Sequence, residues 1–307
     1  MSLTNWIVGL VALALMPALA IQGYNEYALR AARSEGVRAE AIRTARGVAA
    51  DLGQFGRGVR QALRILVEVP EIHGMDPEAC TPYLRTLLDK VPGAFFLGVI
   101  GADGRVVCST VSSARGAYSL SDRRYFQDAT RAGFAVGEYV RGRITDQPTI
   151  QLAQSIPGPD GLPTGVVLAS VDLDYLARQQ SQTGLPTDAT LTVADRKGAI
   201  LLRVPDHAEW VGKLLPAAYL ATLQANRGQV VDMLGLRGTT HITGVAAATS
   251  DDLDGITVFV GLSPVSAFAD LRGPVPPALD RGDHFDAFGA GRVVRTHHTV
   301  GHRHTLP

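Results

Sequence analysis

One arginine and two aromatic residues carry the clearest chemical signal in the sequence. Arg123 stands just before Tyr125 and Phe126. A guanidinium group offers a planar fork that grips a carboxylate through two parallel hydrogen bonds, and aromatic walls exclude water and shape a pocket. This grouping predicts a site for a small anion. The alternative is that Arg123 forms a surface ion pair with Asp122 or Asp128 while the rings belong to the core.

These residues must be positioned by a short helix. Ser121 or Asp122 can cap its start by accepting a backbone N–H bond. The helix is predicted to run to about Arg131 and to stop at Gly133, because glycine commonly follows the last helical residue. Arg123 and both rings would then project from this one helix.

Two predicted strands follow, Phe134–Val140 and Thr149–Ile156, and they bring further polar groups to the site. Tyr139 lies on the first strand and Gln151 on the second. Side chains alternate between the faces of a strand, so Ile150, Leu152 and Ile156 should share one face while Gln151 and Ala153 share the other.

The order of short motifs along this region resembles the double Cache domain, a PAS-like extracytoplasmic sensor of bacterial receptors. The motifs are Asp-Arg-x-Tyr-Phe, Val-Gly-Glu-Tyr, a Gly-Arg-x-Thr-like turn, Gln-Leu-Ala and Gly-x-x-x-Gly-Val-Val. The resemblance covers roughly residues 25–270 and is strongest over 91–175. It implies a sensor that binds a small molecule in its membrane-distal unit.

A finer resemblance concerns the amino-acid-binding subgroup, whose motif is Y-x-x-x-x-R-x-W-Y-x-x-A. The matching positions are Tyr118, Arg123, Tyr125, Phe126 and Ala129. Tyr125 stands where the motif has Trp, and Phe126 stands where it has Tyr, so one hydroxyl is lost. The ligand class implied is therefore a small carboxylate or an amino acid.

An aspartate in that subgroup meets the ammonium group of the ligand. The resemblance implies this role for Asp172, which ends the predicted strand 164–172, or for Asp174, just after it. The alternative is that Asp172 caps the helix that begins at Leu173.

The predicted fold class is α+β, with a long N-terminal stalk helix followed by two PAS-like units, each an antiparallel sheet of about five strands flanked by helices. Asp103-Gly104 and Asp195-Arg196-Lys197-Gly198 each lie between apolar runs, which predicts two equivalent hairpins. In the second unit Lys213, Asp232 and His241 look isolated, so we interpret them as structural or surface residues. The predicted segments are an anchor at 1–24, the stalk at 25–70, the ligand-binding unit at 71–184, the second unit at 185–271 and a tail at 272–307.

The first residues predict contact with a membrane. Trp6 to Ile21 is an unbroken apolar run, shorter than the roughly twenty residues of a membrane span, and Gln22–Tyr24 could extend it at the interface. We prefer an uncleaved anchor because Met1 to Asn5 carry no Lys or Arg. The alternative is a cleaved signal peptide, which Ala18-Leu19-Ala20 fits.

The side of the membrane on which the body lies is a separate question. Basic residues after the apolar run favour the cytoplasmic side, whereas the sensor resemblance favours the periplasmic side, which we adopt. These basic residues are Arg30, Arg33 and Arg38.

Composition and cysteine content further narrow the functional class of the protein. The 29 basic and 29 acidic residues balance, so nothing indicates nucleic acid. In an oxidising compartment Cys80 and Cys108 could form a disulfide; the alternative is two buried free thiols. The sequence has no G-x-S-x-G, H-E-x-x-H or phosphate-binding glycine loop, so we expect no enzymatic activity, no cofactor and no metal site.

The segment after Arg272 breaks the pattern. It is rich in proline and histidine and is expected to be disordered. No kinase, cyclase or methyl-accepting segment follows, and a truncated or frameshifted reading frame is our hypothesis for this ending.

The sequence therefore predicts the input domain of a bacterial signal-transduction receptor, such as a two-component sensor kinase, a diguanylate cyclase or a chemoreceptor. It would sit in the inner membrane with its body in the periplasm. The resemblance implies a homodimer through the stalk helix. The alternative function is an anchored or secreted protein-interaction module without a small-molecule ligand.

Overall fold

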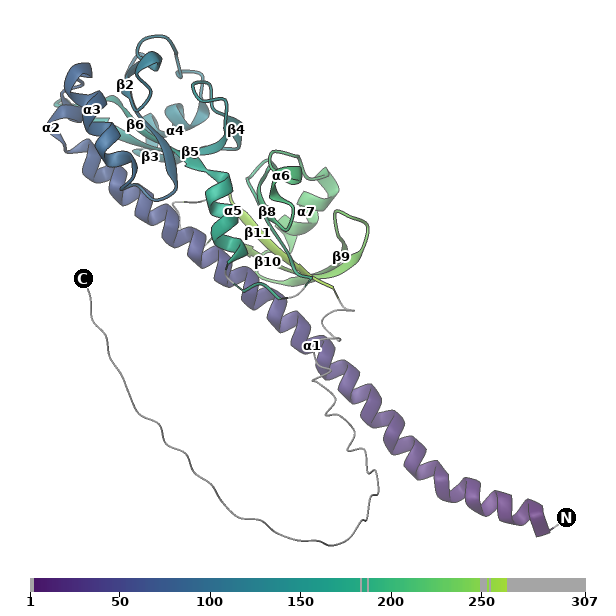
Figure 1. Ribbon diagram of the computed structural model, residues 1–307. Helices are drawn as coiled ribbons and strands as arrows, with labels where there is room; N and C mark the ends of the chain where they lie inside the picture. Colours follow the sequence, from purple (N-terminus) through teal and green to yellow (C-terminus); the bar gives the residue numbers. More distant parts are fainter. Residues whose placement is uncertain (1–2, 183, 187, 249–252, 254, 264–307) are drawn as a thin grey trace, which may run out of the picture. The chain divides into compact units, whose positions relative to one another are not determined.

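The computed structural model describes residues 3–182, 184–186, 188–248, 253 and 255–263, with side chains from residue 13 onward except at 30 and 31. The predicted tail, 272–307, lies outside these residues. The first element is α1, a single helix over Leu3–Val67. The predicted stalk therefore continues the helix of the apolar run without a break (Figure 1).

One side of α1 is buried against the rest of the chain. This buried side lies in the C-terminal half of α1, where small residues come first and larger aliphatic ones follow: Ala41, Ala45, Ala49, Leu52, Val59, Leu63 and Leu66. The small side chains let the backbone of a strand approach the helix closely. Gly244 lies so near that a Cβ atom there would overlap the backbone of Ala41 and Ile42.

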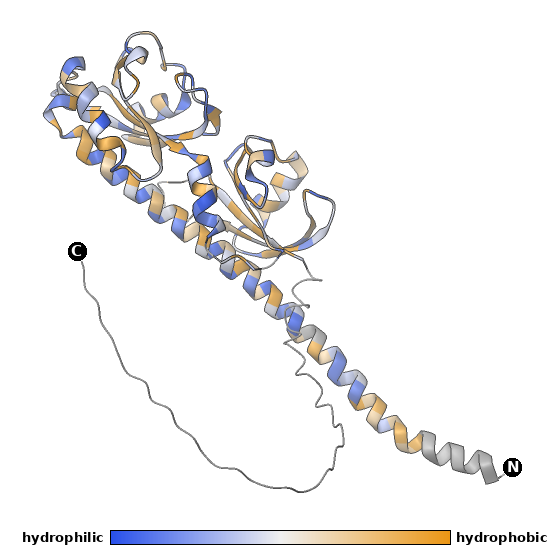
Figure 2. Cartoon of the chain, viewed as in Figure 1, coloured by the Kyte–Doolittle hydropathy of each residue, from blue (hydrophilic) through white to orange (hydrophobic). Residues whose placement is uncertain are grey.

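Before the sheets, α1 carries exposed apolar side chains, visible as an orange stretch in Figure 2. They include Leu13, Leu15, Met16, Leu19 and Ile21. Among the residues that were searched, no helix is both long and apolar enough to cross a membrane. Much of the predicted run, Trp6–Ile21, falls where side chains are not described.

The first unit contains one sheet and four short helical segments. Its strands are β1 (Ala94–Gly101), β2 (Val106–Ser109), β3 (Phe134–Val136), β4 (Val140–Arg141), β5 (Pro148–Pro157) and β6 (Pro163–Asp172). The antiparallel order is β2-β1-β6-β5-β3, and β4 also pairs with β5. The helices are α2 (Pro70–His73), α3 (Pro77–Leu88), α4 (Arg124–Ala132) and the 3₁₀ turn η1 (Ser112–Ala114).

The predicted strand Phe134–Val140 is divided into two. Gly137 donates its N–H to the carbonyl of Gln151 at 2.7 Å, but Tyr139 donates its N–H to Asp195 Oδ2 of the second unit at 2.9 Å. A hydrogen bond that leaves the sheet interrupts the ladder, so the sheet has six strands where five were expected.

A second sheet follows the helix α5 (Leu173–Ser181). Its strands are β7 (Thr190–Ala194), β8 (Ile200–Val204), β9 (Val230–Leu234), β10 (Thr240–Ala247) and β11 (Thr257–Leu262), and its helices are α6 (His207–Trp210) and α7 (Ala217–Ala225). The order β8-β7-β11-β10-β9 repeats the order β2-β1-β6-β5-β3 of the first sheet, in which only β4 has no counterpart among the described strands. The predicted repetition of one architecture is confirmed.

Each sheet buries its two faces differently. One face of both sheets joins the buried side of α1 in a continuous core. The other face of the first sheet packs under α4, and the other face of the second sheet packs under α7. Both units thus have an outer sheet face covered by one short helix. Hydrophobic residues dominate the strands in Figure 2.

The predicted cysteine pair is a disulfide. Cys80 of α3 and Cys108 of β2 are bonded, with their Cα atoms 6.1 Å apart, and both are fully buried. Closing a loop of this length stabilises the folded chain by about 3 to 4 kcal/mol in the chain-entropy account.

Candidate functional site

The helix α4 presents its buried side to the outer face of the first sheet. Tyr125, Phe126 and Ala129 lie on that side, and Gly133 ends the helix with a φ of 84°, where glycine carries no steric cost. The predicted caps are wrong: the N-cap residue is Arg123, and no side chain caps the helix there.

Asp122 has a different partner from the one expected. Arg143, in the turn after β4, donates from Nη1 to Asp122 Oδ1 at 2.9 Å and from Nη2 to Oδ2 at 2.7 Å, and it also donates to the carbonyl of Ser119. This bidentate pair holds the pKa of Asp122 below its ordinary value. This bidentate ion pair connects the loop before α4 to the turn between β4 and β5.

Arg123 is therefore not taken up by the carboxylates proposed as its alternative partners. Asp128 pairs with Arg124 at 3.3 Å, and Asp122 pairs with Arg143. In the described part of the chain no hydrogen bond or ion pair engages the side chain of Arg123, which is half-buried. Its guanidinium group is available to an external anion.

The phenol of Tyr125 lies beside this group. The side chain is 5% exposed, and burial raises its pKa to about 12 in spite of the nearby cations of Arg123 and Arg143. Tyr125 therefore stays protonated at physiological pH and can donate a hydrogen bond. Tyr118 is half-buried and packs against the same cluster.

The sheet beneath α4 carries a buried amide. Gln151 of β5 is 3% exposed, and its Oε1 atom has no hydrogen-bond partner among the described residues. Ile150 and Leu152 face the core shared with α1 whereas Ala153 faces α4, so Gln151 is on the α4 face as predicted. Its register partner across the sheet is Ser170, also buried.

Two predicted site residues lie elsewhere. Tyr139 packs against the core shared with α1, and its ring lies against Gly212 of the second unit. Asp172 is the N-cap of α5, where it accepts the N–H of Tyr175 at 3.1 Å, and it lies 3.5 Å from Arg178. The capping role, the alternative weighed above for Asp172, is the one observed.

Arg143 is the residue that the site prediction missed. The signal for it was the Gly-Arg-x-Thr-like turn, which supported the family resemblance without being assigned a role. Its partner lies 21 positions earlier in the chain, and nothing in local spacing indicates that pairing.

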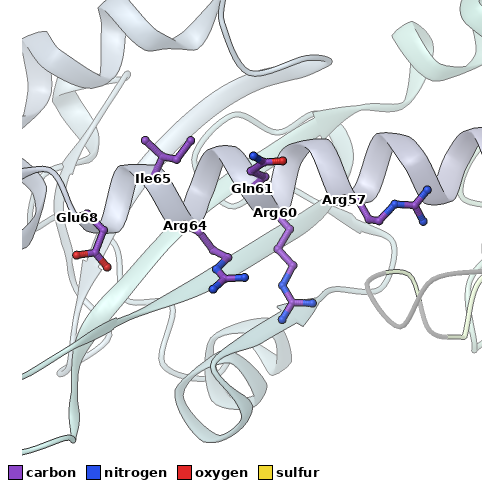
Figure 3. A pocket seen from close by; sticks show the side chains of 6 residues that line it. All are labelled: Arg57, Arg60, Gln61, Arg64, Ile65 and Glu68. Carbon is purple, nitrogen blue, oxygen red and sulfur yellow. The ribbon is translucent and has the colours of Figure 1, made fainter.

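A separate hollow of about 580 Å³ follows the side of α1 (Figure 3). Its lining is mostly polar, and Arg60 places its guanidinium group 4.5 Å from the ring centre of Phe134. The lining residues are Arg57, Arg60, Gln61, Arg64, Ile65 and Glu68. None of them belongs to the predicted site.

A search of the described residues finds no group of three or more His, Cys, Asp or Glu side chains that could hold a metal ion. The histidines of the tail lie outside the residues searched.

No protein-family model matches this sequence. No curated protein matches it either.

Solved structures do match the fold. The extracellular domain of rpHK1S-Z16, a protein assigned as a histidine kinase, superposes with a TM-score of 0.66 at 17% identity, covering 78% of this chain and 98% of that one. The ligand-binding domain of the Campylobacter jejuni chemoreceptor Tlp3, solved with L-valine, gives 0.59 at 12% identity, covering 78% and 97%. That of the Pseudomonas fluorescens chemoreceptor CtaA, solved with L-leucine, gives 0.58 at 17%, covering 73% and 93%.

These neighbours are sensor and ligand-binding domains, and at such low identity the likeness concerns architecture. It agrees with the predicted α+β architecture of a long helix followed by two antiparallel sheets. The described chain has the double Cache fold of extracellular sensor domains.

Proposed function

We propose that this protein senses a small carboxylate or amino acid through the α4 face of its first unit. Arg123 grips the carboxylate, Tyr125 donates a hydrogen bond beside it, and Phe126 and Tyr118 wall the site. The observation that carries the proposal is that the side chain of Arg123 makes no hydrogen bond or ion pair among the described residues, while Arg124 and Arg143 are both ion-paired.

For an amino-acid ligand, the ammonium group needs an acceptor. The carboxylate of Asp172 is already engaged as a helix cap, so its predicted contact with the ligand is not part of this proposal. Gln151 Oε1 is buried without a partner among the described residues, and such a group gains most from a new donor. The neighbours solved with L-valine and L-leucine support an amino acid as the first ligand to test.

The setting follows from the same proposal. The exposed apolar side chains between Leu13 and Ile21 fit an anchor in the inner membrane, and the disulfide fits a periplasmic body. The ligand would act on α1, which packs against both sheets. It could transmit a signal only if it bound the protein more tightly in one arrangement of α1 than in another. A homodimer through α1 belongs to this proposal.

The test is thermal unfolding of the purified chain against amino acids and dicarboxylates. A ligand at one hundred times its dissociation constant should add about 2.7 kcal/mol to the free energy of unfolding. We expect Arg123→Ala to abolish this gain and Arg124→Ala, the matched control, to keep it. A folded Arg123→Ala protein that binds normally would refute the site.

The second candidate function is a protein-interaction module. The observation that favours it is the hollow along α1, where the exposed side chains of Arg57 and Arg64 point to the same side of the helix (Figure 3). If no small acid stabilises the protein and a partner binding to α1 is lost in Arg57→Glu/Arg64→Glu, this function replaces the sensor.

A further inference from the structure

The start of α4 gives little support to the residue that presents the candidate site. Arg123 is the N-cap residue, its backbone is extended, and no side chain caps the helix there. An uncapped first turn leaves backbone N–H groups without intrahelical partners. The side chain of Arg123 makes no hydrogen bond or ion pair among the described residues. The direction in which it points therefore depends on what holds the residues just before the helix.

One backbone hydrogen bond fixes the middle of this segment to the first hairpin. Leu120 donates its N–H to the carbonyl of Gly104 at 2.7 Å. Between Leu120 and the helix, side chains make the contacts. Gln127 of α4 donates from Nε2 to the carbonyl of Ser121 at 3.0 Å, which joins the segment to its own helix but not to the sheet.

The contact from outside the helix comes from Arg143. Its two hydrogen bonds to the carboxylate of Asp122 measure 2.9 and 2.7 Å, and it also donates to the carbonyl of Ser119. One guanidinium group thus holds two points of the segment that leads to α4. Most surface ion pairs contribute little, but a bidentate arginine–carboxylate pair fixes geometry as well as charge.

The turn that carries Arg143 is itself closed by backbone hydrogen bonds. Gly142 donates its N–H to the carbonyl of Gln147 at 2.9 Å, and Asp146 donates its N–H to the carbonyl of Gly142 at 2.8 Å. The turn leads directly into β5, which pairs with β6 from Thr149 onward. Arg143 therefore connects the start of α4 to a part of the sheet that is already ordered.

Two roles are open to a cation in this place. The charges of Arg123 and Arg143 both act on the phenol of Tyr125, so Arg143 is close enough to attract an anion itself. However, both of its terminal nitrogens donate to Asp122, and the attraction that the cation exerts is largely cancelled by the carboxylate beside it. What remains is its effect on the conformation of the segment before α4.

We propose that Arg143 is the positioning residue of the candidate site: its bidentate ion pair with Asp122 holds residues 119–123 in the conformation that presents Arg123 to an anion. This inference rests on the proposed function at Arg123. A segment that is ordered before the ligand arrives does not have to be ordered on binding, which would otherwise reduce the affinity. Loss of the pair should weaken binding without removing any contact to the ligand.

The first test is calorimetric titration of the full chain with L-leucine and with succinate, one probe for each ligand class of the proposed function. We expect Arg143→Ala to weaken binding about tenfold. Arg143→Lys should not restore it, because an ammonium group cannot form the two parallel bonds. Arg141→Ala is the matched control: it removes a cation from the same turn, and its partner, Asp146, lies within that turn, so affinity should be unchanged.

Asp122→Asn separates positioning from charge. Removing a negative charge next to Arg123 would by itself strengthen the binding of succinate, a dianion. If the pair positions Arg123, the same change weakens binding, because the amide offers one acceptor oxygen where the carboxylate offers two. Combined with Arg143→Ala it should cause no further loss, since both changes break one contact.

A second measurement does not need a ligand. The N–H of Arg123 donates to the carbonyl of Leu120 at 3.0 Å, and its hydrogen exchange should become about tenfold faster in Arg143→Ala but not in Arg141→Ala. Full affinity in Arg143→Ala or Arg143→Lys, tighter succinate binding in Asp122→Asn, or unchanged exchange would each overturn the inference. If neither probe binds the natural protein, the proposed function fails for both, and the exchange rate alone decides whether Arg143 orders the segment.

Discussion

Three arginines near α4 make different contacts. Arg124 pairs with Asp128 and with Glu138, and Arg143 donates two hydrogen bonds to Asp122. The side chain of Arg123 makes no hydrogen bond or ion pair with a described residue, although its charge acts on Asp122 and Tyr125. The difference lies in the partners that the fold supplies, not in the residue type. The proposal that Arg123 binds an anion therefore draws on these contacts as well as on the motif resemblance.

At the same scale, two histidines predict how stability depends on pH. Burial is the main cause that lowers the pKa of His207 and of His241 below the ordinary value of 6.5. The unfolded chain therefore binds protons more readily than the folded chain between 6.5 and the lowered values. Stability from these groups is complete above pH 6.5 and is lost as the pH falls through the lowered pKa values.

We expect the double variant His207→Gln/His241→Gln to lose less stability than the natural sequence between about pH 7.5 and pH 5, because it lacks the two groups that take up protons on unfolding. Denaturant unfolding at a series of pH values measures this difference. The prediction would be wrong if the two proteins showed parallel pH profiles.

At the scale of elements, the docking of α1 on the second sheet depends on one glycine. Gly244 of β10 has no space for a Cβ atom because the backbone of Ala41 fills it. Such a close approach of helix and strand fixes how α1 lies on the sheet. It also means that a single methyl group can separate the two.

We expect Gly244→Ala to destabilise the fold by about 2 kcal/mol or more, because overpacking against backbone cannot be relieved by a rotamer change. Gly47→Ala in α1 is the control: a Cβ atom added to Gly47 would have no neighbouring atom within 4 Å, and the helix should gain about 0.5 to 1 kcal/mol. Chemical denaturation of both variants gives the comparison. Equal stabilities would show that α1 can shift without cost.

At the scale of the whole molecule, the short segment between β3 and β4 links the candidate site to the second unit. Glu138 lies 3.3 Å from Arg124 of α4 and 2.5 Å from Lys197 of the second hairpin. Next to it, Tyr139 donates its N–H to Asp195, which is buried and also accepts the N–H groups of Lys197 and Ala199, each at 2.9 Å. A movement of α4 would therefore be transmitted to the hairpin between β7 and β8.

We expect Asp195→Asn to loosen this link, because a bond from an N–H to a carboxylate contributes about 1.5 to 3 kcal/mol. Hydrogen exchange at the Tyr139 amide should become about ten to one hundred times faster. In the first hairpin Asp103 accepts the N–H of Arg105, a bond within its own turn, so Asp103→Asn is the control. Equal exchange rates in the two variants would argue against the link.

Features fixed by neighbours in the chain were predicted from the sequence. The two hairpins turn at Gly104 and Gly198, both with positive φ, because Asp and Gly favour that geometry locally. Gly133 ends α4, and alternation assigned Gln151 to the correct face of β5. The repetition of such local patterns was enough to predict two units of one architecture.

Features that depend on distant partners were decided only by the tertiary structure. Asp122 was expected to cap α4 but is held by Arg143, and the strand from Phe134 was expected to continue but gives the N–H of Tyr139 to Asp195. Arg203, near the end of an apolar strand, gave no local sign that it would be buried without a carboxylate among the described residues. Ion pairs, burial and desolvation depend on which segments meet in space, and spacing along the chain does not encode that meeting.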